Sequence, residues 1–515
     1  MKSYIYIFIL FSLTLTINGC QNLEVDNPNH PDQDNVLTDA SSLKNLAGSI
    51  FQNWYLYNVG YEETPAFMLG TAADATSSSW GNFGMQDMSY EPRIEWNNLP
   101  SYMDSDMTEE FFNNMYSLLS QSNDVLTAIR SDSVINAELG QDREMVKAVA
   151  RLGQGIALGY IGLVFDQGYI VKEDVDLTKD IELQSYDDVI EASIRSLDQA
   201  IEIAQQNYFV IPEEWINGST MNSERFRRLA NFMAAKILLS EPRNSGENEY
   251  IDRWEKILGY AKEGIVNDYT ITADNSVGSW ASLYHFYATN TTWGRVDMRV
   301  VSMIDTCDLP PVWPEKYQGD HTRFSNQGVA YSPDDRLEKD FQFMATHFFS
   351  PDRGYYHYST YRYKRFDDLR QTGFPGQGTI PLYRKAENDY MLAEAYARTN
   401  QVTEAIEVMN DSECARIDRG GEEMAIDEEN ATKQDVLDAI FYERTIELFS
   451  NNLGIQFFDM RRNDKLQIGT PLHLPVPGAE LETLEMENYT YGGVNRADGE
   501  NTSDGGWKEE YYEEN

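Results

Sequence analysis

The chain has 515 residues, with 84 Asp and Glu against 41 Lys and Arg, which gives a formal net charge of −43. So acidic a surface repels phosphate backbones and argues against nucleic acid as a partner. The length allows a large core and more than one structural unit. The three Cys form no CxxC pair and no zinc-ligand spacing, so neither a disulfide framework nor a metal centre is expected.

The N-terminus has the pattern of an export signal. Lys2 precedes an almost unbroken apolar stretch, residues 5–17, which is shorter than the roughly 20 apolar residues of a membrane span. The stretch ends in Ile17-Asn18-Gly19-Cys20, which resembles a bacterial lipobox. We therefore predict that residues 1–19 are a removable signal peptide and that Cys20 carries a palmitate-type lipid anchor. An ordinary signal peptide with a chance cysteine is the alternative.

A polar leader, residues 20–39, follows the cysteine. Pro28 and Pro31 interrupt it, and it shows no helical stripe. The pattern predicts an extended, flexible segment between the lipid and the folded body, which we place at residues 40–515.

Residues 40–272 have helical periodicity. From Tyr186 to Ala204, apolar residues recur at intervals of three and four, which places them on one face of one helix. Similar stripes run through 107–130, 141–165, 223–240 and 250–267. Ser41, Ser185 and Ser223 stand where N-caps are expected, just before periodic runs. The sequence predicts an array of helices of similar length.

Residues 273–385 break this rhythm. In this segment Gly, Pro, Asn and aromatic residues dominate, and 19 of the 87 residues from 280 to 366 are Phe, Trp or Tyr, against 12% in the whole chain. Long irregular insertions are usually functional or disordered, and a high aromatic content argues against disorder. We expect the binding surface in this variable insertion.

A second helical block follows at 386–468. The spacing of Leu392, Ala393, Tyr396 and Ala405 matches the tetratricopeptide pattern, in which small and aromatic residues of one helix pack against an Ala of the next. A plain helix bundle is the alternative. Residues 469–515 form a C-terminal loop region, and its polar, acidic end from Gly492 onward is expected to be a surface loop or a loosely packed strap. Cys307 and Cys414 are expected to be buried and unpaired, although a disulfide between them stays open.

Several motifs, most of them in the second half of the chain, carry a family likeness. The strongest is Tyr442 to Phe449 (YERTIELF), continued by Gly454 to Arg462 (GIQFFDMRR) and a proline-containing segment at 474–477. Asp335-Arg336, residues 384–397 and Ser122 to Leu126 follow the same family pattern. Together they resemble the SusD/RagB family of outer-membrane nutrient-binding lipoproteins. Gln456 stands where the family usually has Arg, which would remove one internal salt bridge.

The resemblance implies a mostly α fold, in which tetratricopeptide-like helix pairs form a scaffold and a large irregular, aromatic-rich loop region forms the binding face. It implies a lipid-anchored protein of the cell outer membrane, facing the exterior, that binds oligosaccharides. It would deliver them to a SusC-like TonB-dependent transporter and act as its lid. Some family members bind peptides instead. The family members are binders without a cofactor.

The charged signature residues are expected to be scaffold. Glu443 and Glu447 lie four residues apart on one helix face, where they can reach arginines of neighbouring elements. Arg461 and Arg462 are expected to form fork-type ion pairs near Asp459 that hold a helix end to the proline-containing loop.

Sugar recognition needs flat aromatic faces for C–H groups and amide or carboxylate partners for hydroxyls. The loop at 73–83 offers Trp80 and Asn82. The insertion offers the other predicted ligand contacts, Trp280, Tyr284, Trp293 and Trp313, with polar partners Asn290, Asp297 and Arg299. Packing of each aromatic ring beneath a loop is the competing interpretation.

The sequence is also compared with two other classes of function, an adaptor and an enzyme. A protein-interaction adaptor would use the helical pairs without binding a nutrient. An enzyme is disfavoured because no G-x-S-x-G, HExxH or P-loop pattern occurs, so no catalytic residue is assigned. The acidic stretch at 495–504 lacks the spacing of a calcium-binding EF-hand loop, and no metal ligand is assigned.

Overall fold

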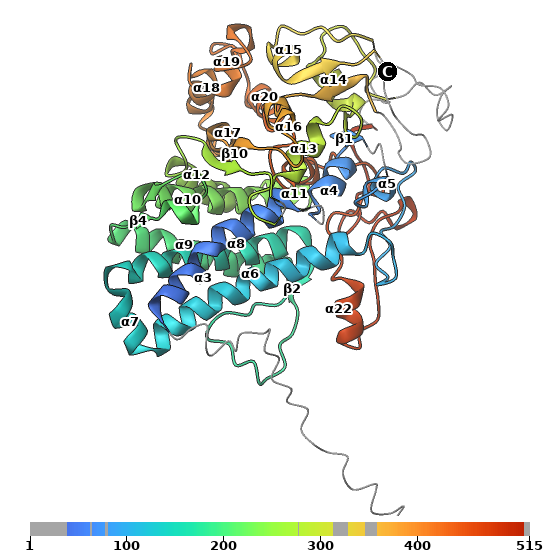
Figure 1. Ribbon diagram of the computed structural model, residues 1–515. Coiled ribbons are helices and arrows are strands. Elements are labelled where there is room, and N and C mark those ends of the chain that lie inside the picture. Colours follow the sequence, from blue (N-terminus) through green and yellow to red (C-terminus); the bar gives the residue numbers. More distant parts are fainter. Residues whose placement is uncertain are drawn as a thin grey trace, which may run out of the picture.

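The computed structural model describes residues 39–61, 64–77, 81–276, 278–312, 328–345 and 358–508. The predicted signal peptide, Cys20 and nearly all of the leader lie outside these residues. The described chain is mostly helical with short strands, and the predicted fold class is confirmed (Figure 1). Within the described residues, no helix combines the length and the apolarity needed to cross a membrane.

The first helical block runs from α3 to α12. Its long helices are α3 (Ala40–Tyr55), α6 (Asp106–Ser131), α8 (Arg143–Val164), α9 (Tyr186–Gln206), α10 (Ser223–Ser240) and α12 (Ile251–Lys262). Its short elements are η1 (Leu56–Gly60), α4 (Ala66–Ala72), β1 (Thr76–Ser77), α5 (Met85–Met88), α7 (Ser133–Leu139), η2 (Gly140–Asp142), β2 (Gln167–Gly168), β3 (Gln184–Ser185), β4 (Val210–Ile211), η3 (Glu213–Trp215), β5 (Met221–Asn222) and α11 (Ser245–Asn248).

Helix α8 is the centre of this block, and α6 and α9 pack along it (Figure 1). From Met145 to Val164 it is buried almost all round, as expected for a helix that is apolar on every face. Glycines let α9 approach closely. A Cβ at Gly155 would meet Leu197, and a Cβ at Gly162 would meet Ile190 and the backbone oxygen of Tyr186.

The predicted N-caps are partly wrong. Ser185 is the N-cap of α9. Helix α3 is capped instead by Asp39, whose carboxylate accepts the backbone N–H groups of Ser41 and Ser42, and α10 is capped by Asn222. In both places an Asp or Asn before the predicted serine supplies the side-chain oxygen that the first turn needs.

The insertion leaves the scaffold and returns to it on one two-stranded sheet. Strand β6 (Tyr269–Ala273) pairs antiparallel with β10 (Gly378–Tyr383), with Ala273 opposite Gly378. Between them lie α13 (Leu283–Thr289), β7 (Arg295–Val296), α14 (Met298–Ile304), α15 (Arg336–Asp340), β8 (Phe341–Phe343), β9 (Tyr361–Tyr363) and α16 (Asp367–Gln371). The insertion therefore rises from one place on the helical block, and it has its own small core around Val300, Phe341 and Tyr363.

The C-terminal block contains α17 (Lys385–Arg398), α18 (Val402–Asn410), α19 (Ala415–Asp418), η5 (Glu422–Met424), α20 (Lys433–Ile446), α21 (Ile455–Arg462), α22 (Gly478–Thr483) and η6 (Val494–Arg496). Helices α17 and α18 pack together, and Ala393 and Ala405 are fully buried, as the tetratricopeptide spacing predicts. Cys307 and Cys414 are both free thiols. Cys414 is buried as expected, but Cys307 is exposed.

Arg462 forms the predicted ion pairs, at 3.0 Å from Asp459 and 2.6 Å from Glu394. Arg461 does not. Its guanidinium donates to the backbone oxygens of Leu163, Ser240 and Leu472, at 2.6–3.0 Å. The C-terminal ends of α8 and α10 leave carbonyls without partners within their own helices, and the buried cation satisfies them.

The C-terminal strap, residues 492–508, is packed more tightly than predicted. Backbone hydrogen bonds join Ser503 to Thr470 and Leu472 to Asn501, and Trp507 is buried. The prediction of a loosely packed strap is therefore wrong for these residues, whereas Asn495 and Arg496 are exposed, as expected of a surface segment. Residues 509–515 lie outside the described part of the chain.

Candidate ligand-binding site

Two segments singled out from the sequence lie together in the structure. Strand β1 of the early loop pairs antiparallel with β7 of the insertion, with Thr76 opposite Val296 and Ser77 opposite Arg295. The next residue, Asp297, donates its backbone N–H to the oxygen of Ala75 at 2.8 Å. The loop at 73–83 and the insertion therefore build one surface.

An aromatic cluster lies beneath and within this surface. Phe67 of α4 stacks on Phe83 with ring centroids 4.8 Å apart, and the edges of Tyr284 and Tyr287 from α13 pack against Phe67. Trp293 lies 5.6 Å from Tyr287. Phe67 and Tyr284 are buried, whereas Phe83 and Trp293 are half-buried. The cluster thus has a covered base and two rings that reach the surface.

The predicted contact residues differ in exposure. Trp280 and Tyr284 each expose 8% of their surface, and Trp280 packs 5.3 Å from the ring of Tyr55. Tyr284 belongs to the covered base of the cluster, whereas Trp280 packs on Tyr55 of α3, and in this structure neither presents a free ring face. Trp293 is half-buried with part of its surface open. Trp80 and Trp313 lie outside the described residues.

Two amides lie near the half-buried rings. Asn82, next to Phe83, is half-buried, and its Oδ1 is buried with no hydrogen-bond partner among the described residues. Asn290, at the end of α13, accepts hydrogen bonds from Thr292 through its Oδ1 at 2.9 Å, which leaves its NH2 group for other partners. A buried acceptor without a partner is costly, and the hydroxyl of a ligand is one group that could satisfy it.

Asp297 and Arg299 are not surface partners for a ligand, contrary to the prediction. Both are buried, and Asp297 caps α14 by accepting the backbone N–H of Arg299. Arg299 donates to the backbone oxygens of Ala73 and Asp74, at 3.2 and 3.0 Å. Burial and the nearby Asp74 raise the pKa of Asp297 well above its ordinary value. These two residues hold the early loop in place.

Asp74 is the buried anchor of the loop, and the sequence motifs did not indicate it. It has a positive φ of 48° and accepts hydrogen bonds from Arg93 and from the indole of Trp507, both at 2.8 Å. Burial alone would raise the pKa of Asp74, whereas Arg93 and Lys508 lower it below its ordinary value. The C-terminal strap therefore helps to hold the early loop of the candidate site in place.

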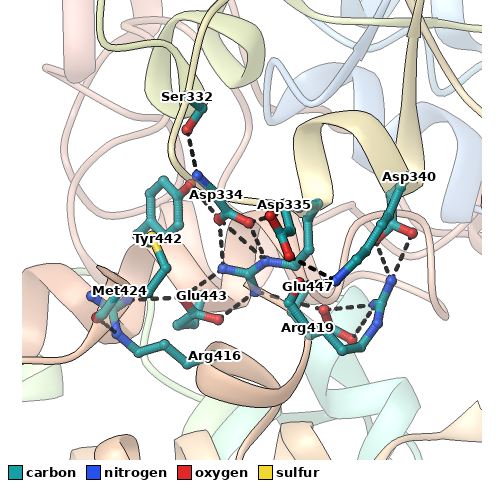
Figure 2. A network of polar contacts seen from close by, with 12 residues as sticks. Ser332, Asp334, Asp335, Asp340, Arg416, Arg419, Met424, Tyr442, Glu443 and Glu447 are labelled. Atoms are coloured by element: carbon teal, nitrogen blue, oxygen red, sulfur yellow. Dashed lines mark hydrogen bonds and ion pairs between the residues drawn. The ribbon is translucent and has the colours of Figure 1, made fainter. Parts of the chain in front are cut away.

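A buried ion network ties the insertion to the C-terminal helices (Figure 2). Arg336, at the start of α15, is fully buried and lies between Asp334 and Glu443 of α20, with N–O distances of 2.7 and 2.6 Å. Arg416 donates to the same Glu443 at 2.8 Å. The scaffold role predicted for Glu443 agrees with this geometry.

Glu447, one turn after Glu443, forms the second half of the network. Arg419 bridges Glu447 and Asp340, at 2.8 and 2.7 Å, as Figure 2 shows. Burial alone would raise the pKa of Glu447, whereas Arg365 and Arg419 lower it to about 2. Glu443 and Glu447 thus hold the insertion to the C-terminal block through Arg336, which also lies 3.6 Å from Glu447, and through Arg365 and Arg419.

The described residues contain no group of three or more His, Cys, Asp or Glu placed to hold a metal ion. The candidate site accordingly consists of aromatic rings and amides on a surface fixed by buried charges. Such a surface can bind a ligand that has both apolar faces and hydroxyl or peptide groups.

Comparisons with known proteins agree with the fold. Residues 318–515 match the family model described as the SusD family. A SusD superfamily protein from Parabacteroides distasonis has a TM-score of 0.58 at 13% identity, over 86% of this chain and 96% of its own. No match was found among curated proteins.

Two other solved structures have similar folds. A putative sugar binding protein from Bacteroides vulgatus has a TM-score of 0.55 at 15% identity, over 88% of this chain and 99% of its own. A crystal structure with xylogluco-oligosaccharide has a TM-score of 0.50 at 15% identity, and the match covers 82% of each chain.

Proposed function

We propose that this chain, whose residues 318–515 match the SusD family model, is a member of that family and binds oligosaccharide nutrients at the surface formed by the early loop and the insertion. The observation that carries the proposal is the cluster of Phe83 and Trp293, two half-buried rings beside the amide of Asn82. Aromatic faces pack against the C–H side of sugar rings, and amides bond to the hydroxyls.

The related structures support a carbohydrate as the ligand class. One of them was solved with a xylogluco-oligosaccharide, and another is described as a putative sugar binding protein. Among the described residues, Arg299 is buried and bonded to the backbone oxygen of Asp74, so it does not offer a surface charge to an acidic ligand. Peptide binding is the alternative, because aromatic and amide groups serve peptides as well.

The protein would also deliver the bound oligosaccharide to a transporter. The lipid on Cys20 would anchor the protein in the outer membrane, facing the exterior, with residues 20–39 as a flexible tether. The folded body would act as the lid of a SusC-like TonB-dependent transporter and pass the oligosaccharide to it. The protein would act by binding, without catalysis and without a cofactor.

The binding surface is tested with Trp80→Ala and Trp293→Ala, separately and combined, on a glycan array and by calorimetry with the glycans that wild type retains. The double variant should lose binding at this surface, while its melting temperature stays close to wild type. Tyr250→Ala, which removes an exposed ring at the N-cap of α12, is the matched control and should bind normally. A large fall in the melting temperature of the double variant would instead assign these rings to packing.

The ligand class and the anchor have separate tests. Retention of peptides but no glycan would favour the peptide-binding alternative, and capture of a transporter without affinity for either would favour an adaptor. A Cys20→Ala variant should leave the cell surface and fail to support uptake. If the Cys20→Ala variant stayed at the cell surface and supported uptake, the proposed lipid anchor would be wrong.

A further inference from the structure

A polar cavity of about 720 Å³ lies on the helical scaffold where α9 ends and α10 begins. It is lined by Ile201, Ala204, Gln205, Gln206, Asn207, Tyr208, Ser223, Glu224, Arg227, Asn231 and Glu263. In Figure 1 the neighbouring strand β4 lies at the edge of the molecule opposite α5 and β1. The cavity is therefore separate from the aromatic surface described above.

The ring of Tyr208 forms one wall of this cavity. Tyr208 exposes 81% of its surface, the highest value among the exposed tyrosines of the described chain. The lining also includes the apolar Ile201 and Ala204 on the last turns of α9. An exposed aromatic ring in a cavity with apolar lining residues can hold the C–H side of a sugar ring.

The charged groups of the cavity are already matched to one another. Arg227 donates to Glu224 at 3.1 Å and to Glu263 at 2.9 Å. Its pKa is raised, chiefly by the hydrogen bond to Glu224. A cation or an anion entering the cavity would have to compete with these pairs. The cavity therefore favours a neutral ligand.

Neutral amide groups of the cavity are available to bind such a neutral ligand. Asn207 and Asn231 each donate to a backbone oxygen of their own helix, at 2.9 Å. Within the described residues, no hydrogen bond reaches the Oδ1 of either amide, and Gln205 has no partner for its side chain. The cavity thus presents acceptors and donors in the pattern that sugar hydroxyls require.

We infer that this cavity is a second carbohydrate-binding site, in which Tyr208 stacks on a sugar ring and Asn207, Asn231 and Gln205 bond its hydroxyls. It lies on the scaffold rather than on the loop surface, so it goes beyond the proposed function. A chain with two separated sites holds a long polysaccharide more firmly than one with a single site.

The test counts binding sites by calorimetry, using the glycans that the wild-type chain retains on an array. Wild type should bind at two sites per chain. Tyr208→Ala should lose one of them, with that affinity falling about tenfold or more, because the aromatic contact is removed. Tyr208→Phe keeps the ring and should keep both sites. Tyr250→Ala is the control for an exposed ring elsewhere.

The outcomes separate this inference from the proposed function. If Tyr208→Ala binds as wild type does, the cavity is not a carbohydrate site, whatever happens at Trp293. If Tyr208→Ala removes the only site and Trp293→Ala changes nothing, the inference stands and the loop surface is wrong. Absence of any glycan binding by wild type overturns both. The melting temperature of Tyr208→Ala should match wild type, since the ring is exposed.

Discussion

Arg336 and Glu443 meet in two nearly parallel hydrogen bonds, at 2.6 and 2.9 Å, although they lie 107 residues apart in the chain. Both side chains are fully buried. The pair joins the first turn of α15, in the insertion, to α20 of the C-terminal block. A bidentate arginine–carboxylate pair fixes direction as well as distance. The surface that carries the candidate site is therefore held to the scaffold by charge and not only by apolar packing.

Removing one member of this pair should be costly. Glu443→Gln leaves the charges of Arg336 and Arg416 buried without their shared partner, so we expect the free energy of unfolding to fall by about 3–5 kcal/mol. Urea denaturation measures the change. Glu191→Gln removes an exposed partner of Arg195 on α9 and should cost less than about 1 kcal/mol. Equal effects of the two substitutions would contradict the structural role of the network.

Close packing of α8 on α9 gives a second prediction. In Gly162→Ala the new methyl group would meet Ile190 and the backbone oxygen of Tyr186, so we expect a loss of about 1–3 kcal/mol despite the better helix propensity of Ala. Gly259→Ala is the matched control. Gly259 is exposed within α12, and its Cβ would meet nothing within 4 Å, so this variant should gain up to about 1 kcal/mol. A lower urea midpoint for Gly162→Ala and a higher one for Gly259→Ala, each compared with wild type, would confirm the contrast.

Periodicity and motif spacing were enough to predict the scaffold. The apolar stripe from Tyr186 to Ala204 forms one face of α9, and Ala393 of α17 and Ala405 of α18 are buried in one cluster where the two helices pack. These features depend on residues close together in the chain, so they can be predicted from a single sequence. The early loop and the insertion were also identified separately from their composition. Their pairing through β1 and β7 could not be predicted, because no local pattern records a two-residue strand contact.

The sequence-based predictions fail at residues whose partners lie far away in the chain. Arg461 was expected to pair with a carboxylate, but the ends of α8 and α10 converge on it and supply carbonyls instead. Trp507 lies in a polar tail with no periodicity, yet Asp74 accepts its indole N–H in the interior. Aromatic enrichment located the insertion correctly, but enrichment alone cannot distinguish the buried Trp280 from the half-buried Trp293.

The two free cysteines should differ in reactivity. Cys307 is exposed, whereas burial raises the pKa of Cys414 to about 12 and shields its sulfur. In a Cys20→Ala chain, a thiol-specific reagent should therefore modify one cysteine under native conditions and a second only after denaturation. Cys307→Ser should abolish the fast reaction. If no thiol reacted in denaturant until a reductant was added, a disulfide between the two cysteines would be indicated instead.

His285 in α13 gives a pH dependence whose sign follows from its contacts. Its Nε2 lies 2.7 Å from the backbone oxygen of Asn451, which can only accept, so this nitrogen carries the proton. Its Nδ1 then accepts from the hydroxyl of Ser282 at 2.6 Å. Burial lowers the pKa of His285 from 6.5 to about 3, so the folded chain keeps the ring neutral.

Between pH 6.5 and 3 the unfolded chain consequently binds more protons at His285 than the folded chain, and stability should fall as the pH falls. The slope approaches about 1.4 kcal/mol per pH unit from this residue.

Glu447, with its pKa lowered to about 2, adds a loss of stability only below its ordinary pKa of 4.5. Carboxyl groups with lowered pKa values therefore contribute little to the pH dependence between pH 6.5 and 4.5, where the neutral His285 contributes. His285→Gln should flatten the dependence of the urea midpoint on pH in that window. Raised carboxyl pKa values, such as that of Asp297, act in the opposite direction in both proteins, so the difference between the two curves is the measurement. Curves of equal slope would mean that His285 is not held neutral by the fold.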